Sequence, residues 1–114
     1  MAIISEDLFD FANLGNEYTG LAGILHISTA TCFSGPRVEF YHELGRDQPY
    51  DYITISETPE LVDFLSSLNA PKKELDQVIE FVKLNNEELL KYWYVGDTMM
   101  YHEVDELIAN FKKV

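Results

Sequence analysis

The sequence predicts a single α+β domain, a three-stranded antiparallel meander with helices packed on one face. Three observations support this fold class. The first half of the chain contains β-branched and alternating segments separated by turn residues. The second half carries apolar residues at helical spacing instead. The length of 114 residues suits one domain, so residues 1–114 are interpreted as a single unit without a linker or a repeat.

Three segments in the first half are typical of β-strands. Residues 23–29 are rich in β-branched side chains, and residues 50–56 place Ile53 and Ile55 on one side. Residues 37–44 alternate between apolar and polar side chains, which is the clearest strand pattern in the chain. Short loops with turn residues join the segments, and short loops favour antiparallel neighbours.

Helices are predicted before and after these strands. A short first helix is expected from Ser5, a candidate N-cap, to Gly15, a candidate terminator. A second helix is expected to begin at Thr58-Pro59-Glu60, which combines an N-cap residue, a proline at the first helical position and an acid in the first turn. Its apolar positions follow helical spacing: Leu61, Phe64, Leu65 and Leu68.

A longer helical pattern follows the stop signal at residues 69–71. Asn86 interrupts its apolar stripe, so a break or a bend is expected at Asn85-Asn86. A turn is expected at Gly96-Asp97 and a last helix over residues 104–112. The apolar stripes of these two helices are Leu75, Val78, Ile79, Val82, Leu89, Leu90 and Trp93, and Leu107, Ile108 and Phe111.

Net charge is the most unusual total. The chain has 20 acids against 8 bases and a net charge of −12, and the bases of residues 1–71 are Arg37 and Arg46. Phosphate backbones and anionic membrane surfaces are bound by clustered Lys and Arg, so direct binding to nucleic acid or to a membrane is not predicted. An acidic field favours a basic protein partner, although acidity also keeps a protein soluble without any partner.

The single cysteine, Cys32, excludes a disulfide within the chain and fits a reducing compartment. The first residues carry no basic segment of a secretory signal, and no apolar run approaches the ~20 residues that span a bilayer. A cytoplasmic location is therefore expected. No helix N-terminus or adjacent base accompanies Cys32, so an ordinary semi-buried thiol is favoured over a nucleophile.

The histidines are the first candidates for a metal site. His26 and His42 lie on adjacent predicted strands. The apolar pattern pairs His26 with Glu43 and Ile27 with His42, so the two rings are expected on opposite faces. His102 lies in a polar stretch and is expected to be exposed. No third ligand stands at a zinc-like spacing, so no metal is predicted.

Known motifs of catalysis and cofactor binding do not occur in the sequence. The glycine-rich phosphate-binding signatures, the nucleophile elbow of serine hydrolases and the paired-histidine zinc motif are all missing. Adjacent acids such as Glu87-Glu88 arise readily in a chain with 20 acids. No cofactor or catalytic residue is therefore predicted. Whether the chain is an enzyme stays open, with a non-enzymatic role favoured.

Aromatic residues give the candidate contact surface. Tyr92-Trp93-Tyr94 has the composition of a binding hot spot, but the favoured interpretation continues Trp93 into the core with a tyrosine on each side. The outer face of the sheet is more informative, because large aromatics on an open face often mark contact surfaces. The predicted partner-binding residues are Arg37, Glu39, Tyr41, Glu43, Tyr50 and Tyr52.

Two stretches resemble a family of small bacterial proteins, the domain of unknown function 4160. Residues 78–93 read V-I-E-F-V-K-L-N-N-E-E-L-L-K-Y-W, which is similar to the family's helical run I-x-x-[FL]-V-x-x-N-x-x-x-L-L-x-x-W. Arg37-Val38-Glu39-Phe40 stands where the family's strand segment H-x-H-V-[EQ]-[YF] would fall. The resemblance covers roughly residues 23–93, but Gly35 and Arg37 replace both family histidines.

The family has no settled activity, and its genes are thought to lie often beside toxin–antitoxin genes. The resemblance therefore implies a small regulatory or antitoxin-like protein. Because the histidine pair is missing here, any role of that pair in relatives does not carry over to this chain.

Together these observations favour a small acidic, non-catalytic protein-binding module that engages a basic partner through its tyrosine-bearing sheet face. It would act as an inhibitor, an antitoxin or a phage-borne antagonist. A sharper alternative is a nucleic-acid mimic, in which rows of carboxylates stand for phosphates. Two further alternatives are a structural homodimer with the tyrosines in its interface, and a small ligand-binding or enzymatic domain with a pocket at His26, His42 or Cys32.

Overall fold

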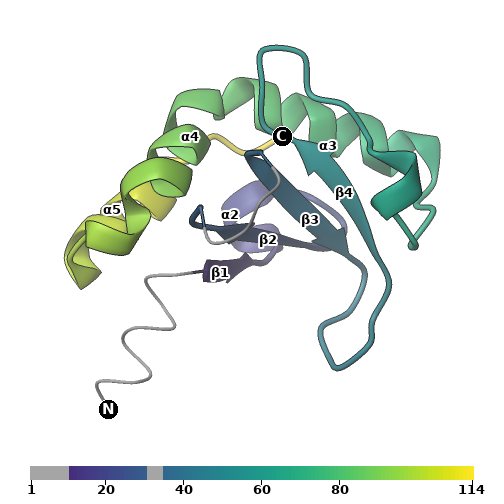
Figure 1. Ribbon diagram of the computed structural model, residues 1–114, viewed down its shortest axis with the longest axis horizontal. Coiled ribbons are helices and arrows are strands. Elements are labelled where there is room, and N and C mark those ends of the chain that lie inside the picture. The colour runs from purple at the N-terminus through teal and green to yellow at the C-terminus, as the bar shows by residue number, and fades with distance from the viewer. Residues whose placement is uncertain (1–10, 31–34) are drawn as a thin grey trace.

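The computed structural model describes residues 11–30 and 35–114 of the chain. These residues form a four-stranded sheet with helices packed on one side of it (Figure 1). The α+β class is confirmed, and the sheet has one strand more than the sequence predicts. Cys32 and the beginning of the first predicted helix lie outside the described residues.

The sheet is an antiparallel meander in which every strand pairs with the next one along the chain. Its strands are β1 (Phe11–Leu14), β2 (Ile24–Ser28), β3 (Arg37–Tyr41) and β4 (Tyr50–Thr54), and this is also their order in space. β2, β3 and β4 fall within the three predicted strand segments. β1 is the additional strand.

β1 occupies the end of the first predicted helix, and the short helix α2 (Asn16–Thr19) begins directly after Gly15, where that helix was expected to end. Ala12 pairs with Ile27 and Leu14 pairs with Leu25, so β1 extends the apolar face of the sheet. A short helix is costly to nucleate, and this pairing therefore decides the local structure. The helix prediction is wrong for the residues of β1.

β2 and β3 pair in a different register from the predicted one, but with the same faces. Ile27 lies opposite Val38, and His26 lies opposite Glu39, four positions before the predicted partner. β3 also ends sooner than predicted, at Tyr41. A shift by an even number of residues keeps every side chain on its face, so the predicted division into inner and outer faces holds.

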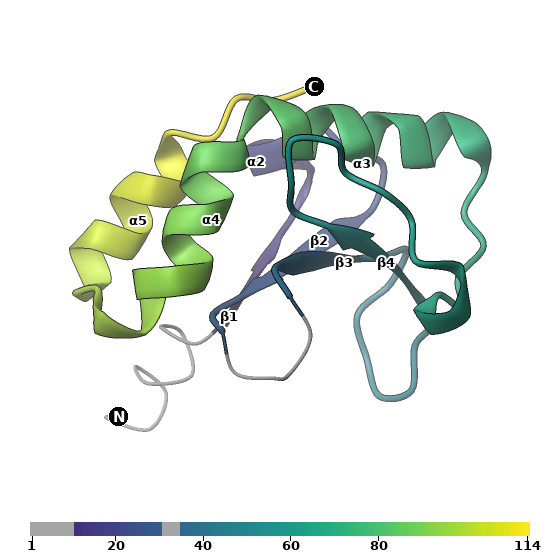
Figure 2. The same ribbon diagram turned by 45° about the horizontal axis from the view of Figure 1, so that its top comes forward.

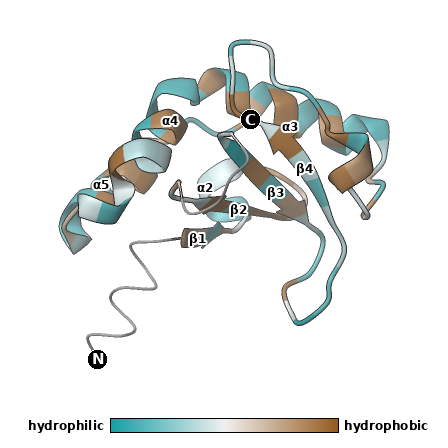
Figure 3. Ribbon diagram, viewed as in Figure 1, coloured by the Kyte–Doolittle hydropathy of each residue, from teal (hydrophilic) through white to brown (hydrophobic). Residues whose placement is uncertain are grey.

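The hydrophobic core lies between the inner face of the sheet and three helices, α3 (Lys72–Leu84), α4 (Asn86–Val95) and α5 (Tyr101–Ala109). Figure 2 shows α3 crossing the sheet, with α4 and α5 side by side at one end. Brown apolar residues alternate with teal polar residues along α3, as expected for a helix with one buried side (Figure 3). Fully buried core residues include Leu25, Ile27, Val38, Phe40, Ile53, Val78, Phe81 and Tyr92.

Asn85 separates α3 from α4, as the sequence predicts. Its side chain is fully buried, and its Nδ2 donates to the carbonyl oxygens of Phe81 at 3.0 Å and Lys112 at 2.9 Å. Its Oδ1 accepts a hydrogen bond from the Lys112 amide at 2.7 Å. The break between the helices is therefore tied to the C-terminal segment. The predicted turn after α4 is also present, as the 3-10 turn η2 (Gly96–Thr98).

The helix predicted from Thr58-Pro59-Glu60 does not form. One short 3-10 turn, η1 (Asp63–Leu65), is the helical structure found in residues 57–70. Leu61 instead forms a β-bridge with Ile53 of β4, and Phe64 is 87% exposed. The helical spacing of these apolar residues therefore does not reflect a buried helix face.

The same segment covers the outer edge of β4. The Val62 amide donates to the Tyr52 carbonyl at 2.8 Å. The Ser67 amide donates to the Tyr50 carbonyl at 2.8 Å. An edge strand presents unpaired backbone groups, and pairing them outweighs the local helix signals of the segment.

Among the described residues, no helix combines the length and the apolar character that crossing a membrane requires.

Candidate functional site

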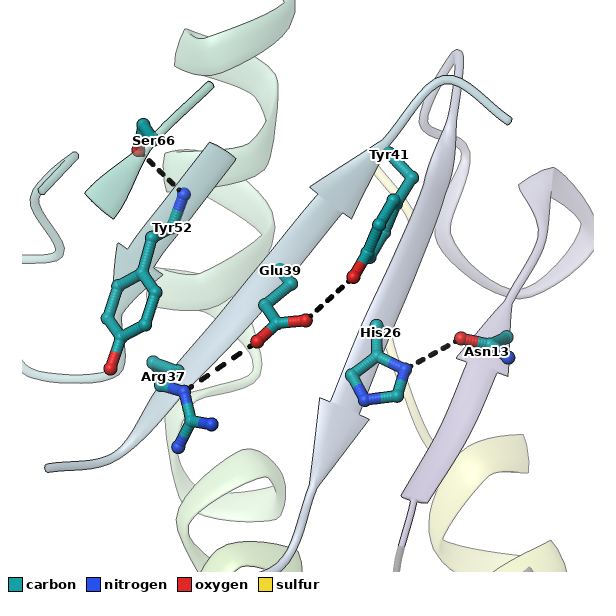
Figure 4. A network of polar contacts seen from close by, with 7 residues as sticks. All are labelled: Asn13, His26, Arg37, Glu39, Tyr41, Tyr52 and Ser66. Carbon is teal, nitrogen blue, oxygen red and sulfur yellow. Dashed lines mark hydrogen bonds and ion pairs between the residues drawn. The ribbon is translucent and has the colours of Figure 1, made fainter. Parts of the chain in front are cut away.

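The outer face of the sheet, opposite to α3, collects polar and aromatic side chains from all four strands (Figure 4). One residue of each strand forms a row across this face: Asn13, His26, Glu39 and Tyr52. Beside this row, Tyr41 of β3 lies directly opposite Tyr50 of β4. None of these side chains belongs to the hydrophobic core cluster. The outer face is therefore a second, polar and aromatic assembly on the sheet.

Glu39 lies at the centre of the outer face. Its Oε1 accepts a hydrogen bond from the Tyr41 hydroxyl at 2.9 Å, and its Oε2 lies 3.9 Å from Nε of Arg37. Burial, the hydrogen bond to Glu39 and the charge of Glu39 raise the pKa of Tyr41. Burial and the Glu39 charge also raise the pKa of Tyr50. Both phenols therefore stay neutral at physiological pH and remain hydrogen-bond donors.

Arg37 is held between two aromatic rings at one end of this face. Its guanidinium carbon lies 5.3 Å from the ring centroid of Tyr52 and 5.2 Å from that of Trp93, which α4 contributes. Both distances lie in the range of cation–π contacts, and such a contact contributes about 2 kcal/mol when the cation is desolvated. The buried hydroxyl of Tyr52 has no hydrogen-bond partner among the described residues.

His26 lies between Asn13 and Glu39 in the row. Its Nδ1 is 2.7 Å from Oδ1 of Asn13, and its ring stacks on Phe11 at a centroid distance of 5.3 Å. Burial lowers the pKa of His26, Glu39 opposes this effect and Arg37 adds to it. The neutral ring is thus favoured, with Nδ1 donating to the amide oxygen of Asn13.

The predicted partner-binding residues are brought together with one exception. Those on the outer face are Arg37, Glu39, Tyr41, Tyr50 and Tyr52. Glu43 lies in the loop after β3 and is exposed to solvent, because β3 ends before it. This correction removes one of the two carboxylates from the predicted acidic face.

Four further residues of this assembly were not predicted as part of it. Asn13 and Phe11 belong to β1, where a helix was expected. The strand alternation places His26 on the outer face. That His26 lies opposite Glu39 can be known only from the observed register of β2 and β3. Trp93 reaches Arg37 because of how α4 docks on the sheet, which no local pattern encodes.

The other candidate residues lie apart from the outer face. His42 contacts Glu74 of α3 through Nε2, at 2.6 Å from Oε1, so His26 and His42 do point to opposite sides as predicted. His102 is exposed on α5. Within residues 11–30 and 35–114, no three His, Cys, Asp or Glu side chains gather as a metal site would require.

The aromatic run at the end of α4 is divided between three environments. Tyr92 is fully buried in the core, whereas Trp93 is buried against Arg37 outside the core cluster. Tyr94 is 64% exposed. Trp93 is thus buried as expected, although it packs against Arg37 and not within the main core cluster, and of the two flanking tyrosines Tyr92 is itself buried.

Two grooves lie beside α5. One, of about 510 Å³, separates β1 from α5 and is lined by residues that include Leu14, Tyr18 and Ile108. The other, of about 450 Å³, lies between α4 and α5 and is lined by Glu88, Met99 and their neighbours. Neither groove contains His26 or His42, the residues expected in a pocket of an enzyme.

Compared with known protein families, with curated proteins and with solved structures, the chain shows no match.

Proposed function

We propose that the protein is a non-catalytic protein-binding module that engages a basic partner through the outer face of its sheet. The observation that carries the proposal is the assembly itself. Tyr41 and Tyr50 lie opposite one another on this face and are partly exposed, and Arg37 is held on the same face by the buried rings of Tyr52 and Trp93. Tyr, Trp and Arg are the residue types that dominate binding energy in protein interfaces.

The partner is proposed to be basic because of the charge of the whole chain, −12. Among the described strand residues whose side chains lie on the outer face, Glu39 carries the one carboxylate, and Arg37 offsets its charge. The acids that attract a partner stand around the face, for example Glu43 and Asp47 in the exposed loop between β3 and β4. A field of this kind speeds the encounter with a positively charged surface.

Nucleic-acid mimicry receives no support from this arrangement. A mimic needs rows of carboxylates at the spacing of phosphates, and the described outer face offers Glu39 alone. A homodimer through the same tyrosines is the competing proposal. The biological role, as an inhibitor, an antitoxin or an antagonist, stays a prediction that rests on the charge and on the family resemblance.

The test is affinity capture with the tagged full-length protein in a lysate of the organism that encodes it, eluted in steps of rising salt. It is run in parallel with Tyr50→Ala, on the outer face, and with Tyr94→Ala, an exposed tyrosine on α4. We expect a stoichiometric basic protein that Tyr50→Ala loses and Tyr94→Ala retains. Equal capture by all three baits, or no partner at low salt, contradicts the proposal.

Light scattering, which measures the mass of the particle in solution, distinguishes the homodimer from a monomeric binding module. The binding module is expected to be a monomer at micromolar concentration. A dimer that Tyr50→Ala dissociates and Tyr94→Ala does not would replace the proposed function with self-association through the outer face.

A further inference from the structure

We infer that Tyr41, Tyr50 and Glu39 form a subsite for one arginine side chain of the partner protein. This inference rests on the proposed function and deepens it, because it names the chemical group that the outer face would recognise. Three features support it: Arg37 is already held in this way on the same face, the rings of Tyr41 and Tyr50 lie together, and Glu39 stands beside them.

The internal example is Arg37. Its guanidinium lies between the rings of Tyr52 and Trp93, at 5.3 and 5.2 Å from their centroids, with Glu39 Oε2 3.9 Å from its Nε. Two aromatic rings and one carboxylate thus hold a guanidinium on one side of Glu39. The surface is therefore already suited to this cation.

On the other side of Glu39, the same elements recur. The rings of Tyr41 and Tyr50 lie directly opposite one another on β3 and β4, with centroids 5.2 Å apart and planes inclined by 38°. Both side chains are partly exposed. The cation–π contacts of Arg37 are with Tyr52 and Trp93, on the first side of Glu39.

Glu39 connects the two halves. Its Oε1 accepts one hydrogen bond, from the Tyr41 hydroxyl, and each carboxylate oxygen can accept two. The negative charge of Glu39 contributes to the raised pKa values of Tyr41 and Tyr50, and at Tyr50 the charge of Arg37 opposes it in part. A guanidinium above these rings would stack on a phenol and donate to Glu39 at the same time. A lysine ammonium lacks the planar face that permits this combination.

The probe for the subsite is N-acetyl-L-arginine amide, titrated into the ¹⁵N-labelled full-length protein at low ionic strength and followed by NMR. N-acetyl-L-citrulline amide has nearly the same shape without the charge and is the matched control probe. We expect saturable shifts of the amides of Glu39, Tyr41 and Tyr50 with the arginine probe. Binding of the citrulline probe should be at least about tenfold weaker.

Variants locate the binding. Glu39→Gln keeps the shape and an acceptor for Tyr41 but removes the charge, and Tyr50→Ala removes one ring. Each should weaken the arginine probe several-fold, whereas Tyr94→Ala should leave it unchanged. The inference is overturned if citrulline binds equally well, if an equivalent lysine probe binds more tightly, or if the shifts map to the acidic helices α4 and α5.

The two proposals fail in different ways. If Tyr50→Ala loses a partner from the lysate but the arginine probe does not bind, only the subsite is wrong. If the probe binds at Tyr41 and Tyr50 but no partner is captured, the subsite stands as a cation site and the proposed function fails.

Discussion

The buried carboxylate of Asp51 is expected to anchor the segment that covers the edge of β4. Asp51 is fully buried, and its Oδ1 and Oδ2 accept hydrogen bonds from the amides of Asn69 and Ala70, both at 2.9 Å. A hydrogen bond to a charged group contributes about 1.5–3 kcal/mol. Asp51→Asn replaces one acceptor with an NH₂ donor that faces a backbone donor. Losing one such bond should lower the free energy of unfolding by about 2–3 kcal/mol.

The assay is urea unfolding at pH 7, followed by far-UV circular dichroism and by the fluorescence of the single tryptophan, Trp93. Asp63→Asn, at an exposed acid in η1, is the matched control and should change stability by less than about 0.5 kcal/mol. The amides of Asn69 and Ala70 should also exchange hydrogen faster in Asp51→Asn than in the wild type. If Asp51→Asn resembles the control in both measurements, the two hydrogen bonds do not hold this segment and the reasoning fails.

Three further substitutions test single features of the fold and of the outer face. Asn85→Ala removes the three side-chain hydrogen bonds at the helix break and should cost about 2–4 kcal/mol in urea unfolding, whereas Asn110→Ala, at an exposed site, should change little. Tyr52→Phe deletes a buried hydroxyl without a partner among the described residues, so stability should stay equal or rise by up to about 1 kcal/mol; a clear loss would reveal a partner. His26 has a lowered pKa in the folded state, so the unfolded chain takes up a proton first as pH falls below about 6.5. The wild type should therefore lose stability relative to His26→Gln between pH 7.5 and 5, and a constant difference would contradict this.

The parts of the fold that could be predicted are those with a strong local pattern. The alternation in residues 37–44 identified β3 and both faces of the sheet, because a period of two is typical of strands. The asparagine pair after Leu84 identified the break between α3 and α4, because a polar residue interrupts the apolar stripe there. These features depend on neighbouring residues, which a sequence shows directly.

The parts that could not be predicted depend on pairing between distant segments. Thr58-Pro59-Glu60 has every local sign of a helix start, but the backbone groups at the edge of β4 and the carboxylate of Asp51 bind the following residues in an extended form. β1 has four residues and a weak pattern, so its pairing with β2 decides its structure. Tertiary hydrogen bonds outweighed local propensity at both places.

The candidate site was predictable to the same extent. Strand alternation placed Arg37, Glu39 and Tyr41 on one face without any knowledge of register. Predicting that Glu39 lies opposite His26 would have required the strand register. Predicting that Trp93 contacts Arg37 would have required the position of α4 on the sheet. The acidic composition also led to the expectation of an acidic outer face. The outer face is instead nearly neutral, because Arg37 lies beside Glu39.

This neutrality separates the role of the net charge from that of the contact surface. Charges spread over the rest of the chain act at long range and are screened beyond about 8–10 Å at physiological salt, so they should mainly set how fast a basic protein arrives. Contacts at Tyr41, Tyr50 and Glu39 would be desolvated in a complex and screened less, so they should set how slowly it leaves. A basic protein without a well-placed arginine would then be attracted but released quickly. Specificity would therefore lie in the outer face, although most of the charge lies elsewhere.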